Sequence, residues 1–301
     1  MPTRRAFLAS ALATGVLRGS EFERLPYTVD ANWPQLPAGW NLQETPGVAV
    51  DANDHVYVFH RGEHPIIELT RDGRVVRSWG EGMFIRPHAI RIDPRGAIWV
   101  VDNDTHQVLK MDPFGRVRMV MGRKGQSGEG PDLFNRPTDV AFAEDGSFYV
   151  SDGYGNSRVA KFSADGTFIT AWGQKGDAPG QFDLPHTVVV GPSGRVYVGD
   201  RENYRLQVFD ADGGFIEQWT DVGSPWGLAL SHDGALFIAD GHNNRILKAG
   251  LDGAVLGQIS SGGKAPGQVD FAHHIAIDSE GSVYVAEIKN WRVQKFVPVS
   301  N

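Results

Sequence analysis

The sequence predicts an all-β protein, a six-bladed β-propeller, because a short apolar motif recurs along the chain at almost regular intervals. The motif occurs six times, starting at Pro46, Pro87, Pro137, Pro185, Pro225 and Ala272. The intervals are 41, 50, 48, 40 and 47 residues, and a period in this range is typical of propellers, in which each repeat forms one four-stranded blade. The 37 Gly and 17 Pro residues also favour short strands and tight turns over long helices.

Residues 1–20 are expected to be an export signal and not part of the propeller. Thr3-Arg4-Arg5-Ala6-Phe7-Leu8 resembles a twin-arginine signal, and an apolar run continues as far as Leu12. We therefore expect an exported, periplasmic or extracellular protein whose single propeller domain occupies residues 21–301. No later stretch reaches the ~20 apolar residues that a membrane span requires, so no membrane association is expected.

The fourth repeat shows how each blade is expected to be built. Its predicted strands cover Thr187 to Val190, Arg195 to Gly199, Arg205 to Asp210 and Phe215 to Trp219. Glycine-containing turns follow the first and the third of these strands, and a polar loop, Asp200 to Tyr204, follows the second. Asp-Gly or Glu-Gly pairs mark tight turns in other repeats. Each complete repeat therefore predicts a four-stranded antiparallel sheet.

The sixth repeat is too short for a fourth strand, because only Pro298 to Asn301 follow its third strand. An unpaired strand edge invites aggregation, so another segment must cover it. Leu25 to Val29 has the composition of a strand and precedes the first repeat. We expect this segment to form the outer strand of the last blade and so to close the ring.

Three histidines indicate a metal site on the propeller axis. The first strand of each blade lines the central channel, so equivalent positions at its start form a ring. His88, His186 and His273 occupy this position in alternate blades and therefore approach the axis from three sides. Three imidazoles with an open fourth position are typical of catalytic zinc, and nitrogen donors favour zinc over magnesium or calcium.

A second set of residues is expected on the rim of this site. The loop after the second strand of each blade lies on the same face as the ring, because neighbouring strands are antiparallel. Arg61, Tyr154 and Arg201 lie in such loops; two arginines can grip a carboxylate, and a tyrosine can transfer a proton. Structural roles stay open here, because Arg201 could pair with Glu202 and Tyr154 could pack within its loop.

Several runs of residues carry a family resemblance. The pairs Trp79-Gly80 and Trp172-Gly173 and the connectors Pro179 to Phe182 and Pro266 to Val269 look like parts of NHL repeats, which form six-bladed propellers. The runs most specific to one enzyme family are His60 to His64, Arg86 to His88, Asp152 to Arg158, Leu184 to His186 and Asp200 to Asn203. On these runs the chain resembles the peptidyl-α-hydroxyglycine α-amidating lyases over nearly its whole length after residue 40.

The resemblance implies an enzyme, a carbon–nitrogen lyase that cleaves a peptidyl-α-hydroxyglycine to an amide and glyoxylate. His88, His186 and His273 match the family's zinc ligands. Tyr154 matches its proposed catalytic base, and Arg61 and Arg201 match its substrate-contacting arginines. The implied cofactor is Zn²⁺, and the implied partner is a small-molecule or peptide substrate with a carboxylate. We expect the protein to act as a monomer.

The chain also departs from the family pattern. Directly after the third zinc histidine the family carries an aspartate that helps to hold a structural calcium ion, and here that position is His274, which argues against calcium. The chain has no cysteine, so it lacks the family's disulfides. Its net charge of −7 gives no basic surface for a nucleic-acid partner.

Two other functions remain open from the residues alone. A different metal-dependent propeller hydrolase, such as a lactonase, would need a carboxylate base, for which Asp139 and Glu202 are the rim candidates. A non-catalytic NHL-repeat binding module would use recognition aromatics, for which Trp226, Tyr204 and Trp291 are candidates. The binding module explains the fold but not the alternating histidines.

Overall fold

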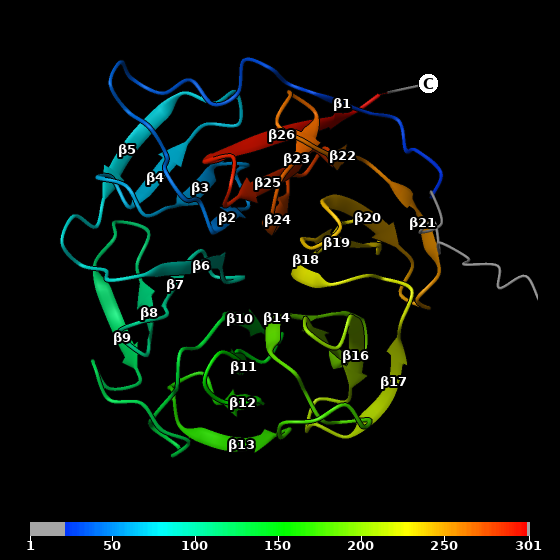
Figure 1. Cartoon of the computed structure of the whole chain (residues 1–301). Coiled ribbons are helices and arrows are strands. Elements are labelled where there is room, and N and C mark those ends of the chain that lie inside the picture. Colours follow the sequence, from blue (N-terminus) through cyan, green and yellow to red (C-terminus); the bar gives the residue numbers. More distant parts are fainter. Residues whose placement is uncertain (1–21, 300–301) are drawn as a thin grey trace, which may run out of the picture.

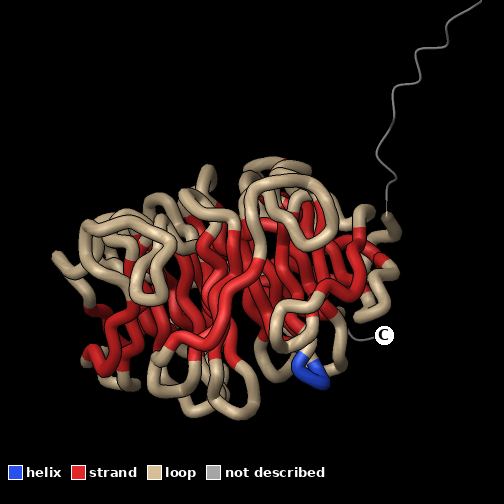
Figure 2. The backbone as a smooth tube through the Cα atoms, turned by 90° about the horizontal axis from the view of Figure 1, so that it is seen from below, coloured by secondary structure: helices blue, strands red, loops and turns tan. Residues whose placement is uncertain are grey.

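The computed structural model describes residues 22–299, which form a six-bladed β-propeller (Figure 1). Six four-stranded sheets surround a central axis, and the strands run between two faces that carry the loops (Figure 2). The predicted all-β fold class is therefore confirmed. The predicted export signal, residues 1–20, lies outside the described residues.

Each of the first five blades consists of four consecutive strands that pair in sequence order. Blade 1 contains β2 (Gly47–Val50), β3 (Val56–Phe59), β4 (Ile66–Leu69) and β5 (Val75–Trp79). Blade 2 contains β6 (Pro87–Ile92), β7 (Ile98–Asp102), β8 (Gln107–Met111) and β9 (Val117–Met121). Blade 3 contains β10 (Asp139–Phe142), β11 (Phe148–Asp152), β12 (Arg158–Phe162) and β13 (Phe168–Trp172). Blades 4 and 5 contain β14 (Pro185–Val190), β15 (Val196–Asp200), β16 (Arg205–Phe209) and β17 (Phe215–Trp219); and β18 (Pro225–Leu230), β19 (Leu236–Asp240), β20 (Arg245–Ala249) and β21 (Val255–Gln258).

The sixth blade combines the two ends of the described chain. Its strands β24 (Ala272–Ile277), β25 (Val283–Glu287) and β26 (Arg292–Pro298) are followed outward by β1 (Tyr27–Val29), which pairs antiparallel with β26. In Figure 1 the blue β1 lies beside the red β26. Backbone bonds extend the pairing on both sides: Asp30 N–H donates to Lys295 O at 2.9 Å, and Val299 N–H donates to Pro26 O at 2.8 Å.

Hydrophobic clusters fill the spaces between neighbouring blades throughout residues 22–299. Between blades 2 and 3, for example, the ring of Trp99 lies 4.7 Å from that of Phe148, and Phe148 stacks on Phe162 at 5.2 Å. Fully burying one such side chain contributes roughly 1.5–3 kcal/mol. Because each cluster uses residues of two blades, the core forms a ring around the axis, and the innermost strands line the channel.

Two short elements lie outside the six sheets. β22 (Ser261–Gly262) and β23 (Gln268–Val269) form a small parallel pair in the connection to blade 6, and a single 3₁₀ turn covers Pro192–Gly194. Within the described part of the chain, no helix has the length and apolar character needed to span a bilayer.

Candidate metal centre

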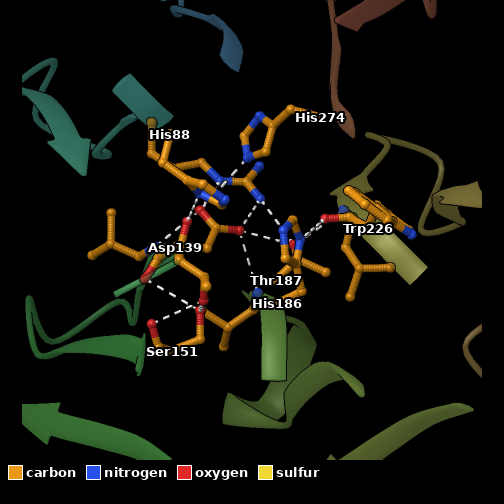
Figure 3. Close-up of polar contacts among 12 residues, drawn as sticks. His88, Asp139, Ser151, His186, Thr187, Trp226 and His274 are labelled. Carbon is orange, nitrogen blue, oxygen red and sulfur yellow. Dashed lines mark hydrogen bonds and ion pairs between the residues drawn. The ribbon is translucent and has the colours of Figure 1, made fainter. Parts of the chain in front are cut away.

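Three buried histidines face one another at one end of the central channel. His88, His186 and His273 are the second residues of the innermost strands β6, β14 and β24, and none is more than 2% exposed. One nitrogen from each ring lies within 4.8 Å of the others; Figure 3 shows two of the rings, those of His88 and His186. The structure thus brings together the histidines of the alternating pattern as a cluster that can hold a metal ion.

Backbone carbonyls fix the orientation of all three rings. The Nδ1–H groups of His88, His186 and His273 donate, in that order, to the carbonyl oxygens of Thr138 (2.6 Å), Trp226 (2.6 Å) and Pro46 (2.7 Å). Each acceptor belongs to the next blade around the ring. Thr138 and Trp226 occupy the position that corresponds to the histidines, and Pro46 directly precedes it. With the proton on Nδ1, each Nε2 presents its lone pair toward the axis, as a metal ligand requires.

Burial keeps these imidazoles neutral. It lowers the pKa of His88 to about 3, and the charge of Arg61 adds to the effect. Burial also lowers the pKa of His186 and of His273 well below the ordinary value, with further contributions from Arg201 for the former and His88 for the latter. Because metals bind the neutral imidazole, the three lone pairs are available at neutral pH.

The hydroxyl of Tyr154 lies beside two of the candidate ligands. Its Oη is 3.3 Å from His88 Nε2 and 3.2 Å from His186 Nε2. Arg201 donates to the same oxygen from a terminal guanidinium nitrogen at 3.2 Å. Tyr154 is 38% exposed, so this oxygen links the buried histidine cluster to the open rim.

Arg201 forms the structural ion pair with Glu202 that the sequence left open, and it also contacts the site through Tyr154. Its Nε donates to Glu202 at 2.7 Å, and its guanidinium lies 4.1 Å from the centre of the Trp226 ring. The pairing with Glu202 leaves NH1 directed at Tyr154. The ion pair therefore orients the guanidinium without removing it from the rim.

Arg61 approaches the cluster from blade 1. It pairs with Glu44 and donates from Nε to the carbonyl oxygen of Pro87 at 3.2 Å, next to His88. The backbone N–H of Gly62 donates to Nδ1 of the buried His60 at 3.0 Å, which fixes the turn that carries Arg61. His60 thus supports the rim through the backbone.

Buried acids at the ends of the second strands hold the rim loops. The carboxylate of Asp200 accepts hydrogen bonds from Asn203 (2.8 Å), from Nε of Arg205 (2.8 Å) and from the backbone N–H of Asp183 (2.7 Å). Asp152, Asp240 and Glu287 bind equivalent Asn and Arg side chains in blades 3, 5 and 6. These contacts explain why an Asn and an Arg follow the buried acid in blades 3 to 6, and because Arg201 directly follows Asp200, they place Arg201 near the axis.

Comparisons with known proteins identify relatives along most of the chain. The NHL repeat family matches residues 84–111, 134–162 and 182–209. A Caenorhabditis elegans protein named as a probable peptidyl-α-hydroxyglycine α-amidating lyase is 30% identical over 286 residues, which cover 84% of this chain and 82% of that protein. The chain belongs to the family of peptidyl-α-hydroxyglycine α-amidating lyases.

Other relatives of the chain are longer proteins or have names that state no activity. The chain is 33% identical over 313 residues to peptidyl-glycine α-amidating monooxygenase A of Xenopus laevis, a match that covers 89% of this chain but only 33% of that protein. Human NHL repeat-containing protein 3 is 33% identical over 303 residues, covering 93% of this chain and 86% of that protein.

Solved structures share the fold of this lyase-family chain. Streptogramin B lyase superposes with a TM-score of 0.65 at 16% identity, covering 90% of this chain and 97% of that chain. A gluconolactonase from Xanthomonas campestris gives a TM-score of 0.65 at 15% identity, covering 85% and 87%. At these identities the likeness shows the propeller fold alone.

Asp139, predicted as a rim carboxylate, lies inside the channel instead, and that prediction was wrong. Its exposure is 0%, and Arg91 donates to both of its carboxylate oxygens, at 2.9 and 2.6 Å. Burial alone would raise the pKa of this carboxyl, but the Arg91 charge holds it well below its usual value. Asp139 follows Thr138 into β10, and that single step along the strand carries its side chain below the ring of histidines.

Polar groups from four blades meet at Asp139 (Figure 3). Besides the Arg91 pair from blade 2, the hydroxyl of Thr187 in blade 4 donates to Asp139 at 2.8 Å. The backbone N–H of Leu228 in blade 5 donates to that hydroxyl oxygen at 3.2 Å. These bonds tie blades 2 to 5 together across the channel.

His274 adds the two remaining blades to this group. Its Nδ1–H donates to the carbonyl oxygen of Val48 in blade 1 at 3.0 Å. Its Nε2 lies 3.6 Å from Asp139 Oδ1, which is too far for a hydrogen bond, and burial together with the Arg91 charge lowers its pKa. We call Arg91, Asp139, Thr187 and His274 the channel hub, since the hub brings residues of all six blades into contact.

The donors at the hub do not fit the structural calcium ion of the family that the chain resembles. Calcium binds several oxygen ligands, most of them carboxylates and carbonyls. Here the imidazole of His274 occupies the carbonyl of Val48, and the one carboxylate of the hub is already paired with a guanidinium. The hub therefore carries its own cation, Arg91, in place of a metal.

The opposite end of the channel is lined mainly by apolar side chains, together with Arg91 of the hub. A cavity of about 230 Å³ opens there, and the described side chains that line it include Ile92, Phe142, Leu230 and Ile277 but no histidine or carboxylate. The nitrogens of the three clustered histidines, Tyr154 and both rim arginines thus lie on the face of the propeller beyond the hub.

Proposed function

We propose that the protein is a zinc-dependent carbon–nitrogen lyase that converts an N-acyl-α-hydroxyglycine into an amide and glyoxylate. The observation that carries this proposal is the position of Tyr154 Oη, within 3.3 Å of two ligand nitrogens and 3.2 Å from Arg201. Three neutral imidazoles fit zinc, and their open side faces the tyrosine. Membership of the lyase family supports the reaction class.

The rim residues supply binding and proton transfer. Arg61 and Arg201 bind the substrate carboxylate, since guanidinium groups match its geometry. This orients the α-hydroxyl toward Tyr154, whose oxygen accepts a hydrogen bond from Arg201. A bound zinc ion would polarise the α-hydroxyl and favour its deprotonation.

The reaction balances without an added reactant. Tyr154 accepts the hydroxyl proton, the C–O bond becomes the carbonyl of glyoxylate, and the bond between the α-carbon and the amide nitrogen breaks. The electrons of that bond pass to the nitrogen, which takes up the proton that Tyr154 accepted and leaves as the amide. No water is consumed, which separates this lyase from a hydrolase.

A hydrolase finds less support at the rim. Such an enzyme needs a carboxylate free to activate water, but Asp139 is buried and paired with Arg91, and Glu202 is paired with Arg201. A binding module alone gives no reason for three convergent neutral histidines.

The deciding experiment measures glyoxylate release from N-benzoyl-α-hydroxyglycine together with the metal content of the purified protein. We expect bound zinc and glyoxylate production that chelation abolishes and added zinc restores. His186→Ala should lose both the metal and the activity, while His232→Ala, which changes an exposed histidine, should keep both.

The other outcomes identify the alternatives. A metal-containing protein that hydrolyses a lactone but releases no glyoxylate would be a hydrolase, and a metal-free, inactive protein would be a binding module. Either result would overturn the proposal.

A further inference from the structure

Four aromatic side chains form a continuous surface from the metal centre to the edge of the rim. Trp226 lies 5.2 Å from the ring of His186 and 5.5 Å from that of His273. Phe271 packs edge-on against Trp226 at 4.4 Å, His242 does so at 5.2 Å, and Tyr204 lies 5.5 Å beyond His242. We call Tyr204, His242, Trp226 and Phe271 the aromatic shelf.

The backbone does not account for an aromatic residue at the outer end of the shelf. Tyr204 has a φ of 53°, in the left-handed region, and directly precedes the third strand of its blade. Asn244 holds the same loop position in blade 5, with the same φ of 53°. Asparagine tolerates this conformation far better than a bulky residue, so Tyr204 carries a conformational cost that asparagine would avoid.

Packing does not account for Tyr204 either. The residue is 46% exposed, whereas Trp226 at the inner end is only 5% exposed. Trp291 is similarly strained and exposed, but Tyr204 differs from it in lying against His242 of the shelf. Strained residues cluster at ligand sites, where the conformational cost is retained because the side chain is needed. The outer end of the shelf therefore presents an exposed aromatic side chain, Tyr204, that neither the turn nor the core requires.

Charge fixes which part of a substrate would reach the shelf. Arg201 lies above Trp226 and also contacts Tyr154, so it stands at the junction of the shelf and the metal centre. A carboxylate bound there leaves the acyl side of an N-acyl-α-hydroxyglycine free to extend away from the metal. On the other side of Tyr154 a groove of about 420 Å³ is lined by Glu129, Lys175 and Asp183, which suits a polar group and not an apolar one.

We propose that the aromatic shelf is the acyl subsite and that the preferred substrates carry an aryl or a large apolar group next to the scissile amide. This inference rests on the proposed lyase reaction for its direction of binding. Aromatic pairs contribute beyond simple burial, and the shelf supplies ring edges and faces over the path that an acyl group would follow.

The test compares N-benzoyl-α-hydroxyglycine with N-acetyl-α-hydroxyglycine in the holoenzyme and in Tyr204→Asn. We expect the ratio of kcat/KM values, benzoyl over acetyl, to fall by roughly threefold to tenfold in the variant, because one aromatic contact is lost. Asparagine suits the left-handed φ, so the variant should unfold at the same or a higher denaturant concentration, which excludes misfolding as the cause.

Trp291→Asn is the matched control. Trp291 has a φ of 54°, is 57% exposed and directly precedes the third strand of blade 6, but among the described rings no contact joins it to the shelf. Its replacement should have the same effect on stability and leave the substrate ratio unchanged. An unchanged ratio in Tyr204→Asn, or an equal fall in both variants, would overturn the proposal.

A binding measurement separates failure of the subsite from failure of the lyase assignment. Titration calorimetry with N-benzoylglycine and N-acetylglycine needs no turnover, and we expect tighter binding of the benzoyl compound, reduced in Tyr204→Asn. If this preference is present but glyoxylate is not released, the shelf stands and the reaction is wrong. If both compounds bind equally, or an N-succinyl compound binds better, the acyl group lies in the polar groove and the shelf proposal fails.

Discussion

At the scale of single residues, the oxygen of Tyr154 is the most specific chemical feature of the site. It lies within hydrogen-bonding distance of two candidate ligands and of a guanidinium group. Tyr154→Phe removes this oxygen and leaves the three histidines in place. We therefore expect kcat to fall at least about 100-fold, the usual loss for a proton-transfer group, while zinc content stays that of the parent. Full activity in the variant would exclude Tyr154 as the base.

The buried histidines make stability depend on pH. Burial lowers the pKa of His88 to about 3 and that of His60 to about 4, against an ordinary value of 6.5. Between these values the unfolded chain binds more protons than the folded one, so acidification favours unfolding. For the metal-free protein we expect a loss of about 2 kcal/mol for each such imidazole between pH 7 and pH 5, measured by urea denaturation in the presence of a chelator.

His60→Gln isolates one of these contributions. The residue is not a candidate ligand, and a glutamine oxygen can accept the N–H of Gly62 that His60 accepts now. The variant should lose about 2 kcal/mol less than the parent over the same pH interval. Equal losses of stability in the two proteins would show that folding does not lower the pKa of His60.

At the scale of the elements, the repeat positions could be predicted because each blade is a contiguous stretch with its own turns. The histidine ring followed from that alignment, since residues at equivalent positions of β6, β14 and β24 must approach one axis. The carbonyls of Thr138, Trp226 and Pro46 that orient the rings could not be predicted, because main-chain groups leave no pattern in the sequence.

Depth along a strand was the other feature that the sequence did not reveal. Thr138 lies at the level of the histidines, and Asp139, one residue further along, already belongs to the channel hub. The alignment of repeats predicts the direction from which a residue approaches the axis. It does not predict the depth of that residue in the channel, or which carboxylate forms an ion pair there. Asp139 and Arg91 belong to neighbouring blades and lie 48 positions apart in the sequence.

The pairing of β1 with β26 leads to a prediction at this scale. Asp30 donates to Lys295 and Val299 donates to Pro26, so by the antiparallel alternation Thr28 and Val297 form a hydrogen-bonded pair. Thr28→Pro removes the N–H that faces β26, and we expect a loss of about 3 kcal/mol in chemical denaturation. Thr28→Ala keeps the N–H and alters an exposed side chain, so it should change stability by less than about 0.5 kcal/mol.

The outcome of this comparison tests how the ring is closed. If β1 protects the edge of β26, Thr28→Pro should also increase self-association in size-exclusion chromatography, because an open strand edge recruits other strands. Equal stability of the proline and alanine variants would show that the sixth blade does not depend on its outer strand.

At the scale of the whole molecule, the channel hub connects parts that the hydrophobic core leaves separate. The core is divided among the interfaces between neighbouring blades, so each cluster holds only two blades. The hub lies on the axis and contacts all six blades, directly beneath the histidines. A change in the hub is therefore expected to act on the stability of the entire ring and on the geometry of the metal centre.

Arg91→Met tests the hub, because it removes the cation and leaves the Asp139 carboxylate buried without a partner. Breaking a buried ion pair in this way typically costs 3–5 kcal/mol, and we expect a loss of about that size at pH 7. The loss should shrink at pH 5, since burial raises the pKa of an unpaired Asp139 and a protonated carboxyl is tolerated.

Arg74→Met, in an ion pair whose side chains are 69% and 60% exposed, should cost less than about 1 kcal/mol. Calcium should not restore Arg91→Met, because His274 still occupies the carbonyl of Val48. Similar losses of stability in the two variants would show that the hub does not stabilise the ring. Rescue by calcium would show that Arg91 does not take the place of a metal ion there.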